Sequence, residues 1–172
     1  RTLIESCRVS DAPPLARIVV AVDPPASSGK RADACGLVAA GITGDGAIYV
    51  IADETVSQAT PSAWAAKAIA LWRKLEADAL VAEINQGGEM VKSVINEVDA
   101  GVPVVSVRAH RGKYLRAEPV ATLYEQGRVK HAGTFPALED EMCDFGPSGL
   151  SSGRSPDRLD ALVWAIASLT FT

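Results

Sequence analysis

The feature that most constrains the fold is an unbroken aliphatic run, Ile18 to Val22, that ends on Asp23. A run of this length predicts a strand buried on both faces of a sheet, because a half-exposed strand would alternate apolar and polar residues. Pro24 and Pro25 end the strand, since neither can donate a ladder hydrogen bond. We therefore expect Asp23 at the carboxyl edge of a central strand, where ligands of open α/β sheets bind.

Strands come first along the chain, and strands alternating with helices follow. The predicted strands are residues 18–23, 34–42, 47–52, 78–85 and 102–109, and the predicted helices are 60–77, 87–98, 113–127, 135–145 and 156–171. The turn signal at Thr43–Gly46 joins the second and third strands into an antiparallel hairpin. The later strands are separated by helices, which implies parallel pairing through right-handed crossovers. The pattern predicts a mixed α/β sheet.

The length and composition fit one soluble domain. The chain has 172 residues, of which 48% are hydrophobic and 22% charged, and no apolar run is long enough to span a membrane. Its three cysteines are odd in number and widely spaced, which indicates a reducing, cytosolic setting and no zinc site. Because the first residue is not Met, we expect residues 1–16 to be a linker from a preceding domain and residues 17–172 to form the domain itself.

The net charge of −4 does not exclude a phosphate partner, because basic residues crowd into one short stretch. That stretch contains Arg108, His110, Arg111, Lys113 and Arg116. Catalytic carboxylates would add negative charge of their own, so the distribution of charge is more informative than its sum.

Carboxylates at strand and helix ends form the candidate chemical site. Asp23 and Glu83 each end an apolar strand, and Asp157 and Asp160 lie three positions apart near the start of the last helix. Asp33, before the second strand, could be a fifth member. Ligands that are all carboxylate oxygens select Mg²⁺ or Mn²⁺, and a pair of such ions suits hydrolysis of a phosphodiester.

Each of these carboxylates also has a purely structural interpretation. Asp23 could hydrogen-bond its own turn, and Glu83 could simply end its strand. Asp157 is favoured by the helix dipole in a first turn, and Asp33 is typical of a solvated loop. For Asp160, which is flanked by apolar residues near the buried side of its helix, the two interpretations balance. The joint pattern favours a metal site more than any single residue does.

Other chemistries find little support. The stretch from Pro24 to Arg31 looks like a phosphate-binding loop, but GxxxxGK[ST] requires Gly at the first of these positions and Ser or Thr at the second. A nucleotide-binding module is therefore disfavoured. No GxSxG elbow occurs.

With these residues assembled, the chain resembles the C-terminal nuclease domain of tailed-phage large terminases, particularly the kind found in phage-like gene transfer agents. The similar stretches are VAVDPPASSGKRADACGLVAAG, LVAEINQGGEMV, RGKYLRAEPVATLYEQGRVKH and SPDRLDALVWA. The resemblance covers nearly everything after residue 17. It implies a ribonuclease H-like five-stranded sheet of order 3-2-1-4-5, with the second strand antiparallel, which would place Asp23 and Glu83 on adjacent strands.

The resemblance also implies an activity and its residues. It implies an endonuclease that uses Mg²⁺ or Mn²⁺, two ions in all, to cut concatemeric double-stranded DNA during genome packaging. Asp23 and Glu83 match the family's first-strand and fourth-strand acidic residues. The acidic position of the last helix falls on PDRLD, where Asp160 is slightly preferred and Asp157 is second. Asp33 matches an additional aspartate that some members carry.

The same resemblance implies partners and a location. An ATPase domain would precede Arg1, the portal and the small terminase subunit would be partners, no membrane would be involved, and the host bacterial cytoplasm would be the site of action. We expect the DNA backbone to be contacted by Lys113 and Arg116, with Arg108, Arg111 and Lys30 nearby. The alternatives are another ribonuclease H-like enzyme (a junction resolvase or an RNA–DNA hybrid nuclease) and a non-catalytic module that docks on DNA or portal.

Overall fold

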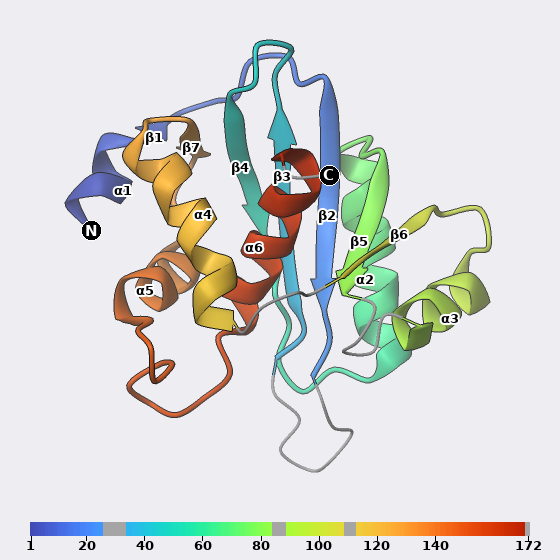
Figure 1. Cartoon of the computed structure of the whole chain (residues 1–172). Helices are drawn as coiled ribbons and strands as arrows, with labels where there is room; N and C mark the ends of the chain where they lie inside the picture. The colour runs from blue at the N-terminus through green and yellow to red at the C-terminus, as the bar shows by residue number, and fades with distance from the viewer. Residues whose placement is uncertain (26–33, 84–88, 109–112, 171–172) are drawn as a thin grey trace.

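A seven-stranded mixed sheet forms the centre of the computed structural model (Figure 1), with the strand order β1-β7-β4-β3-β2-β5-β6. The structure describes residues 1–25, 34–83, 89–108 and 113–170, and for 113–115 it describes the backbone alone. The strands are β1 (Arg8–Val9), β2 (Arg17–Asp23), β3 (Gly36–Ile42), β4 (Ile48–Asp53), β5 (Ala79–Glu83), β6 (Val104–Val107) and β7 (Val129–Ala132). Strand β3 is antiparallel to both β2 and β4, and the other neighbouring pairs are parallel.

Two layers of helices cover the two faces of the sheet. The helices are α1 (Thr2–Ser6), α2 (Pro61–Lys74), α3 (Glu89–Val98), α4 (Lys113–Glu125), α5 (Pro136–Asp144) and α6 (Asp157–Thr170). Helices α2 and α3 pack on one face, and α4, α5 and α6 cover the other, with α6 lying directly over β3 and β2 (Figure 1). The described residues include no helix with the length and apolar character needed to cross a membrane.

Strand β2 is buried on both faces, as its aliphatic run predicts. Val20 and Val22 belong to the core under α2 and α3, whereas Val19 and Ala21 belong to the core under α6. Because successive side chains of a strand point to opposite faces, Asp23 is on the α6 side of the sheet. This alternation decides which helices can reach the end of β2.

Local signals in the sequence account for the well-predicted elements. Gly46 adopts a φ of +94° and donates its N–H to the Thr43 carbonyl, which closes the β3–β4 hairpin. The Thr60 hydroxyl accepts a hydrogen bond from the Ala63 N–H, so it caps α2, with Pro61 at the first helical position. Both features were expected from the sequence alone.

The five central strands have the expected order, and the sheet is larger than expected. The order β4-β3-β2-β5-β6 corresponds to 3-2-1-4-5 in the five-strand numbering, with β3 antiparallel. Strand β7, which is not among the five predicted strands, pairs with β4, and β1 pairs with β7. Two short strands thus extend the sheet beyond β4.

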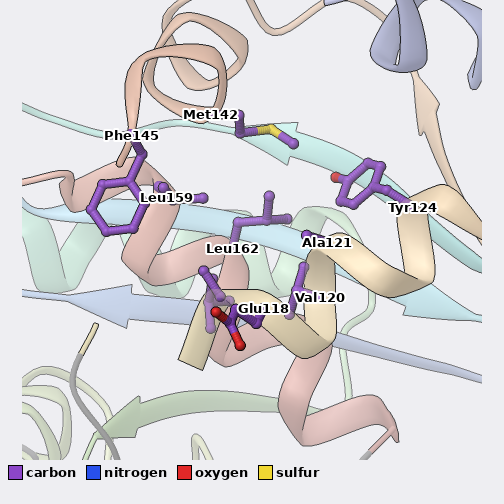
Figure 2. A pocket seen from close by; sticks show the side chains of 10 residues that line it. Glu118, Val120, Ala121, Tyr124, Met142, Phe145, Leu159 and Leu162 are labelled. Atoms are coloured by element: carbon purple, nitrogen blue, oxygen red, sulfur yellow. The ribbon is translucent and has the colours of Figure 1, made fainter. Parts of the chain in front are cut away.

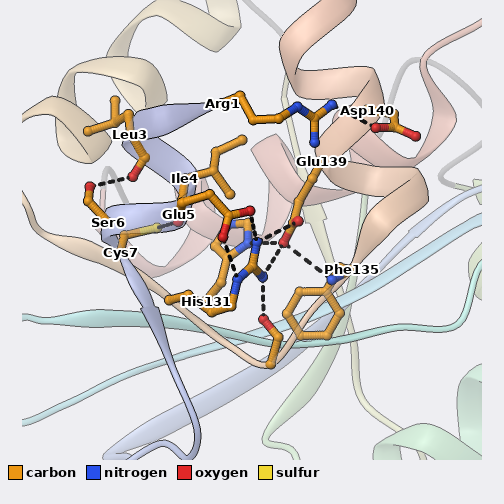
Figure 3. Close-up of polar contacts among 12 residues, drawn as sticks. Arg1, Leu3, Ile4, Glu5, Ser6, Cys7, His131, Phe135, Glu139 and Asp140 are labelled. Atoms are coloured by element: carbon orange, nitrogen blue, oxygen red, sulfur yellow. Dashed lines mark hydrogen bonds and ion pairs between the residues drawn. The ribbon is translucent and has the colours of Figure 1, made fainter.

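The stretch at residues 1–16, expected as a linker, carries α1 and β1 and is attached to the domain by a buried polar network (Figure 3). The Arg8 guanidinium donates to both carboxylate oxygens of Glu139, at 2.8 and 2.9 Å. His131, which has no exposed surface, lies between the Glu139 carboxylate (2.9 Å) and the Tyr124 hydroxyl (2.6 Å). Burial lowers the pKa of His131, which favours the neutral ring. In that form Nδ1–H donates to the Glu139 carboxylate, which can only accept, and Nε2 accepts from the Tyr124 hydroxyl.

Candidate active site

Asp23 and Glu83 lie at the ends of two adjacent parallel strands. In the β2–β5 pair, Ala21 is opposite Val81, and each carboxylate follows two residues later. Since side chains two apart share a face, both carboxylates are on the α6 side of the sheet. Glu83 is buried and Asp23 is half-buried. The pairing therefore brings the two predicted strand-end carboxylates to one edge.

Helix α6 begins against this same edge. Gly36 is the cross-strand partner of Asp23, and a Cβ built at Gly36 would collide with the backbone carbonyl of Asp157 and lie 3.1 Å from the Ala161 Cβ. Only a glycine allows the first turn of α6 to approach β3 this closely. The approach carries Asp157 and Asp160, each 7% exposed, to the end of the sheet where Asp23 lies.

The pKa of the Cys35 thiol is raised in part by two of these carboxylates. Burial raises the pKa of Cys35, and the negative charges of Asp23 and Asp157 raise it further. A thiol that senses both charges lies close to both side chains, because charge effects of this kind fade with distance. Strand β2 and helix α6 thus contribute carboxylates to the same neighbourhood.

A cation from helix α4 also reaches the site. The Arg116 Nη1 lies 3.7 Å from the Glu83 Oε1, and the Arg116 guanidinium lies 4.6 Å from the centre of the Trp164 ring. The Arg116 side chain is 14% exposed. Arg116 is therefore directed into the site from the helix layer.

Buried contacts fix the first turn of α6. The Glu141 carboxylate accepts the Leu159 N–H at 3.1 Å and pairs with Arg158 at 3.4 Å. The Arg158 Nε donates to the Asp53 Oδ2 at 3.1 Å. Because Asp53 ends β4, Arg158 ties the helix start to a third strand end, and burial raises the pKa of Glu141.

The sequence model of the family described as "Terminase RNaseH-like domain" matches residues 20–169. The chain belongs to this family. The match includes Asp23, Glu83, Asp157 and Asp160 and every strand of the sheet except β1 and the first residues of β2. No curated protein matches the sequence.

Solved structures share the terminase RNaseH-like fold at low sequence identity. The large terminase of bacteriophage HK97 has a TM-score of 0.72 and 14% identity, covering 98% of this chain and 42% of that one. The large terminase nuclease of the thermophilic phage G20c has a TM-score of 0.69 and 18% identity, covering 92% and 86%. The nuclease domain of the terminase large subunit gp2 of bacterial virus Sf6 has a TM-score of 0.66 and 13% identity, covering 95% of each chain. The present chain thus spans less than half of the HK97 protein.

The structure brings some of the predicted site residues of this terminase domain together, and others lie outside its described part. Asp23, Glu83, Asp157 and Asp160 come to one end of the sheet, whereas Asp33 lies outside the described residues. Of the predicted DNA contacts, Arg108 is exposed directly after β6, and Arg116 is turned inward to Glu83. Lys30, Arg111 and the Lys113 side chain lie outside the described part of the structure.

The donor chemistry of the terminase site suits a hard divalent cation. The four carboxylates offer only oxygen ligands, which fit Mg²⁺ or Mn²⁺. Within the residues that the structure describes, no three acidic, His or Cys side chains are arranged so that they could hold a metal ion as they stand. The residue types fit the ions, and binding would require the side chains to converge.

Sequence reasoning missed Asp53, Glu141 and Arg158. Asp53 carries the same signal as Asp23 and Glu83, namely an acidic residue that ends an apolar strand. Glu141 and Arg158 carry no local signal, because their roles depend on how α5 packs beside the start of α6.

Proposed function

We propose that this domain is a divalent-metal-dependent endonuclease that cuts concatemeric double-stranded DNA during genome packaging. The observation that carries the proposal is the β2–β5 pairing, which sets Asp23 and Glu83 side by side at the edge where helix α6 begins. Membership of the terminase RNaseH-like family supports it. The G20c terminase nuclease has been solved with zinc and the Sf6 domain with calcium, which supports divalent-metal use in this fold.

In phosphodiester hydrolysis, the role of the four carboxylates would be to bind and position the metal ions. Asp23 and Glu83, with Asp157 and Asp160, would hold Mg²⁺ or Mn²⁺ and fix the ions against the sheet edge. When bound, such ions lower the pKa of the attacking water and stabilise the leaving oxygen. The burial of Glu83, Asp157 and Asp160 keeps these ligands from competing water, which strengthens their hold on a cation.

Basic residues around the site would hold the DNA backbone. Arg108 lies one residue beyond Val107, the β6 partner of Glu83, so its charge is available at the same edge. Lys113 begins α4, the helix that carries Arg116. We assign Arg108, Lys113, Arg116, Arg111 and Lys30 to phosphate contacts.

We propose that the domain works as part of a DNA-packaging motor. The chain would be one part of a large terminase, preceded by an ATPase domain and working with the portal and the small subunit in the host bacterial cytoplasm. The resemblance of the motifs to terminases of gene transfer agents supports a role in a phage-like particle of that kind.

Cleavage of supercoiled plasmid with Mg²⁺ or Mn²⁺ tests the proposal. We expect metal-dependent nicking and linearisation by the unmodified chain and a loss of about a thousandfold or more in Asp23→Asn, which keeps the size but removes the charge that holds the ion. Asp45→Asn is the matched control, because Asp45 is exposed in the β3–β4 turn at the opposite end of the sheet. Equal cleavage by Asp23→Asn would refute the site.

Substrate choice separates the proposal from its alternatives. A terminase-type nuclease should cut linear duplex at least as well as branched DNA or an RNA–DNA hybrid. Clear preference for a four-way junction would indicate a resolvase, and preference for the hybrid a hybrid nuclease. Absence of both cleavage and Mn²⁺ binding would indicate a docking module.

A further inference from the structure

Arg116 makes two contacts that hold its charge inside the candidate active site. Its guanidinium stacks on the Trp164 ring at 4.6 Å, and its Nη1 lies 3.7 Å from the Glu83 Oε1. With 14% of the Arg116 side chain and 6% of the Glu83 side chain exposed, the pair is shielded from water. A guanidinium on an aromatic face keeps a favourable cation–π contact that does not depend on Glu83.

Arg116 and Glu83 are too far apart to form a direct hydrogen bond. A separation of 3.7 Å exceeds the roughly 2.7–2.9 Å of a charge-assisted hydrogen bond. Arg116 and Glu83 thus form an ion pair without a direct hydrogen bond, and the guanidinium can keep its contact with Trp164 when a metal ion takes its place beside Glu83. The Arg116 side chain is thus held more firmly by Trp164 than by Glu83.

Helix α4 is also incompletely packed beside this point. A cavity of about 220 Å³ lies between parts of α4, α5 and α6 (Figure 2). Its lining includes Ala117 and Glu118, which directly follow Arg116, and Val163, which precedes Trp164. Close packing resists side-chain displacement, so the cavity leaves the start of α4 room to adjust when Arg116 moves.

We propose that Arg116 is a positioning residue that occupies Glu83 until a divalent ion binds, and then turns on Trp164 toward the phosphate of the DNA. The inference rests on the proposed nuclease function. Glu83 cannot serve a guanidinium and a divalent ion equally with the same oxygen, because the two cations repel each other across a few ångströms. Arg116 thus delays metal loading, and once released it supplies a positive charge where the DNA backbone must bind.

Metal affinity measured by calorimetry with Mn²⁺ tests the first half. Arg116→Gln keeps a long stem beside Trp164 and removes the charge, and we expect it to bind Mn²⁺ about tenfold more tightly than the unmodified chain. Arg116→Lys should bind with nearly unmodified affinity. Arg128→Ala is the matched control, since it removes an exposed arginine at the amino end of β7, opposite the site, and should leave the affinity unchanged.

Tryptophan fluorescence tests the movement itself. Adding Mg²⁺ should change the emission of the unmodified chain as Arg116 leaves Glu83, and the change should vanish in Arg116→Gln and in Trp164→Phe. A merely structural role of Arg116 predicts the same Mg²⁺ response with or without its charge.

The outcomes separate this inference from the proposed function. If the unmodified chain and Arg116→Gln bind Mn²⁺ equally, or the variant binds more weakly, the Arg116 inference is overturned and the nuclease proposal stands. If neither binds Mn²⁺, the nuclease proposal is refuted and the Arg116 inference with it.

Discussion

The backbone carbonyl of Asp157 occupies the space that a side chain at Gly36 would need. Gly36 is also the cross-strand partner of Asp23, so one glycine sets the separation between a strand-end carboxylate and the helix that brings two more. The geometry of the candidate site therefore depends on a position with no side chain.

Replacing this glycine should damage both stability and metal binding. Gly36→Ala forces the start of α6 away from β3, and we expect a cost of about 2 kcal/mol in the free energy of unfolding, measured by urea denaturation. Gly44→Ala is the control, because a Cβ there meets nothing within 4 Å and should change stability by less than about 0.5 kcal/mol. Equal stability of the Gly36 variant and the unmodified chain would contradict this account of α6.

Asp53 is expected to position α6 rather than bind metal. Its carboxylate accepts the Arg158 Nε at 3.1 Å and a hydrogen bond from the Thr55 hydroxyl at 2.7 Å, so its oxygens are used within the protein. Asp53→Asn should cost about 1–3 kcal/mol of stability and reduce plasmid cleavage far less than Asp23→Asn does. A loss of cleavage as complete as that of Asp23→Asn would make Asp53 a metal ligand instead.

The Arg8–Glu139 network should make stability depend on acid pH. Burial alone would raise the pKa of Glu139, but Arg8, His131 and the Phe135 N–H together lower it to about 2. Because the folded pKa is below the unfolded one, the stabilisation is complete above about pH 4.5 and disappears as the pH falls toward 2. Its size is about 3 kcal/mol at most.

Urea denaturation between pH 2 and pH 7 measures this contribution, because the stabilisation changes between the folded and unfolded pKa values of Glu139, about 2 and 4.5. The difference in stability between the unmodified chain and Glu139→Gln should be largest near neutral pH and shrink in acid. Asp140→Asn, a neighbouring carboxylate that is exposed and pairs with Arg1, should show a small difference at every pH. A difference for Glu139→Gln that does not vary with pH would show that the pKa of Glu139 is not lowered.

Arg108 and Lys113 should contribute to DNA affinity through phosphate contacts. Each contact to duplex DNA adds about 0.9 to the slope of log affinity against log salt, so the double change Arg108→Ala and Lys113→Ala should lower that slope by about 2. Fluorescence anisotropy with a labelled linear duplex at several salt concentrations measures it, with Arg128→Ala as the charge-matched control. A slope that stays unchanged would remove both residues from the DNA interface.

The sequence correctly predicts the elements whose signals come from neighbouring residues. The aliphatic run of β2, the Thr60 cap of α2 and the Thr43–Gly46 turn each depend on neighbouring residues, and each was predicted correctly. The adjacency of Asp23 and Glu83 was not local, and the family resemblance supplied it by implying the strand order.

The features that the sequence did not predict depend on distant packing. Strand β1 is only two residues long, which is too short for a periodic pattern. Arg8 pairs with Glu139, which is 131 residues later in the sequence. Likewise, the sequence predicts Arg116 as a DNA contact but carries no signal for its contacts with Glu83 and Trp164, which depend on the packing of α4 on α6. Pairings between helices that are far apart in sequence leave no trace in either segment alone.

The choice between Asp157 and Asp160 as the metal ligand of α6 gives the last prediction. The sequence alone slightly favoured Asp160, but Asp157 is the residue whose backbone touches Gly36 and whose charge, with that of Asp23, raises the pKa of Cys35. We therefore expect Asp157→Asn to abolish plasmid cleavage and Mn²⁺ binding as fully as Asp23→Asn.

Asp160→Asn serves as the comparison, because it makes the same chemical change one helical turn further along α6 at equal burial, 7% for each residue. It should weaken Mn²⁺ binding by a smaller factor, since we expect the native Asp160 carboxylate to attract the ion mainly through its charge. Full loss of Mn²⁺ binding in Asp160→Asn, with binding retained in Asp157→Asn, would reverse the assignment.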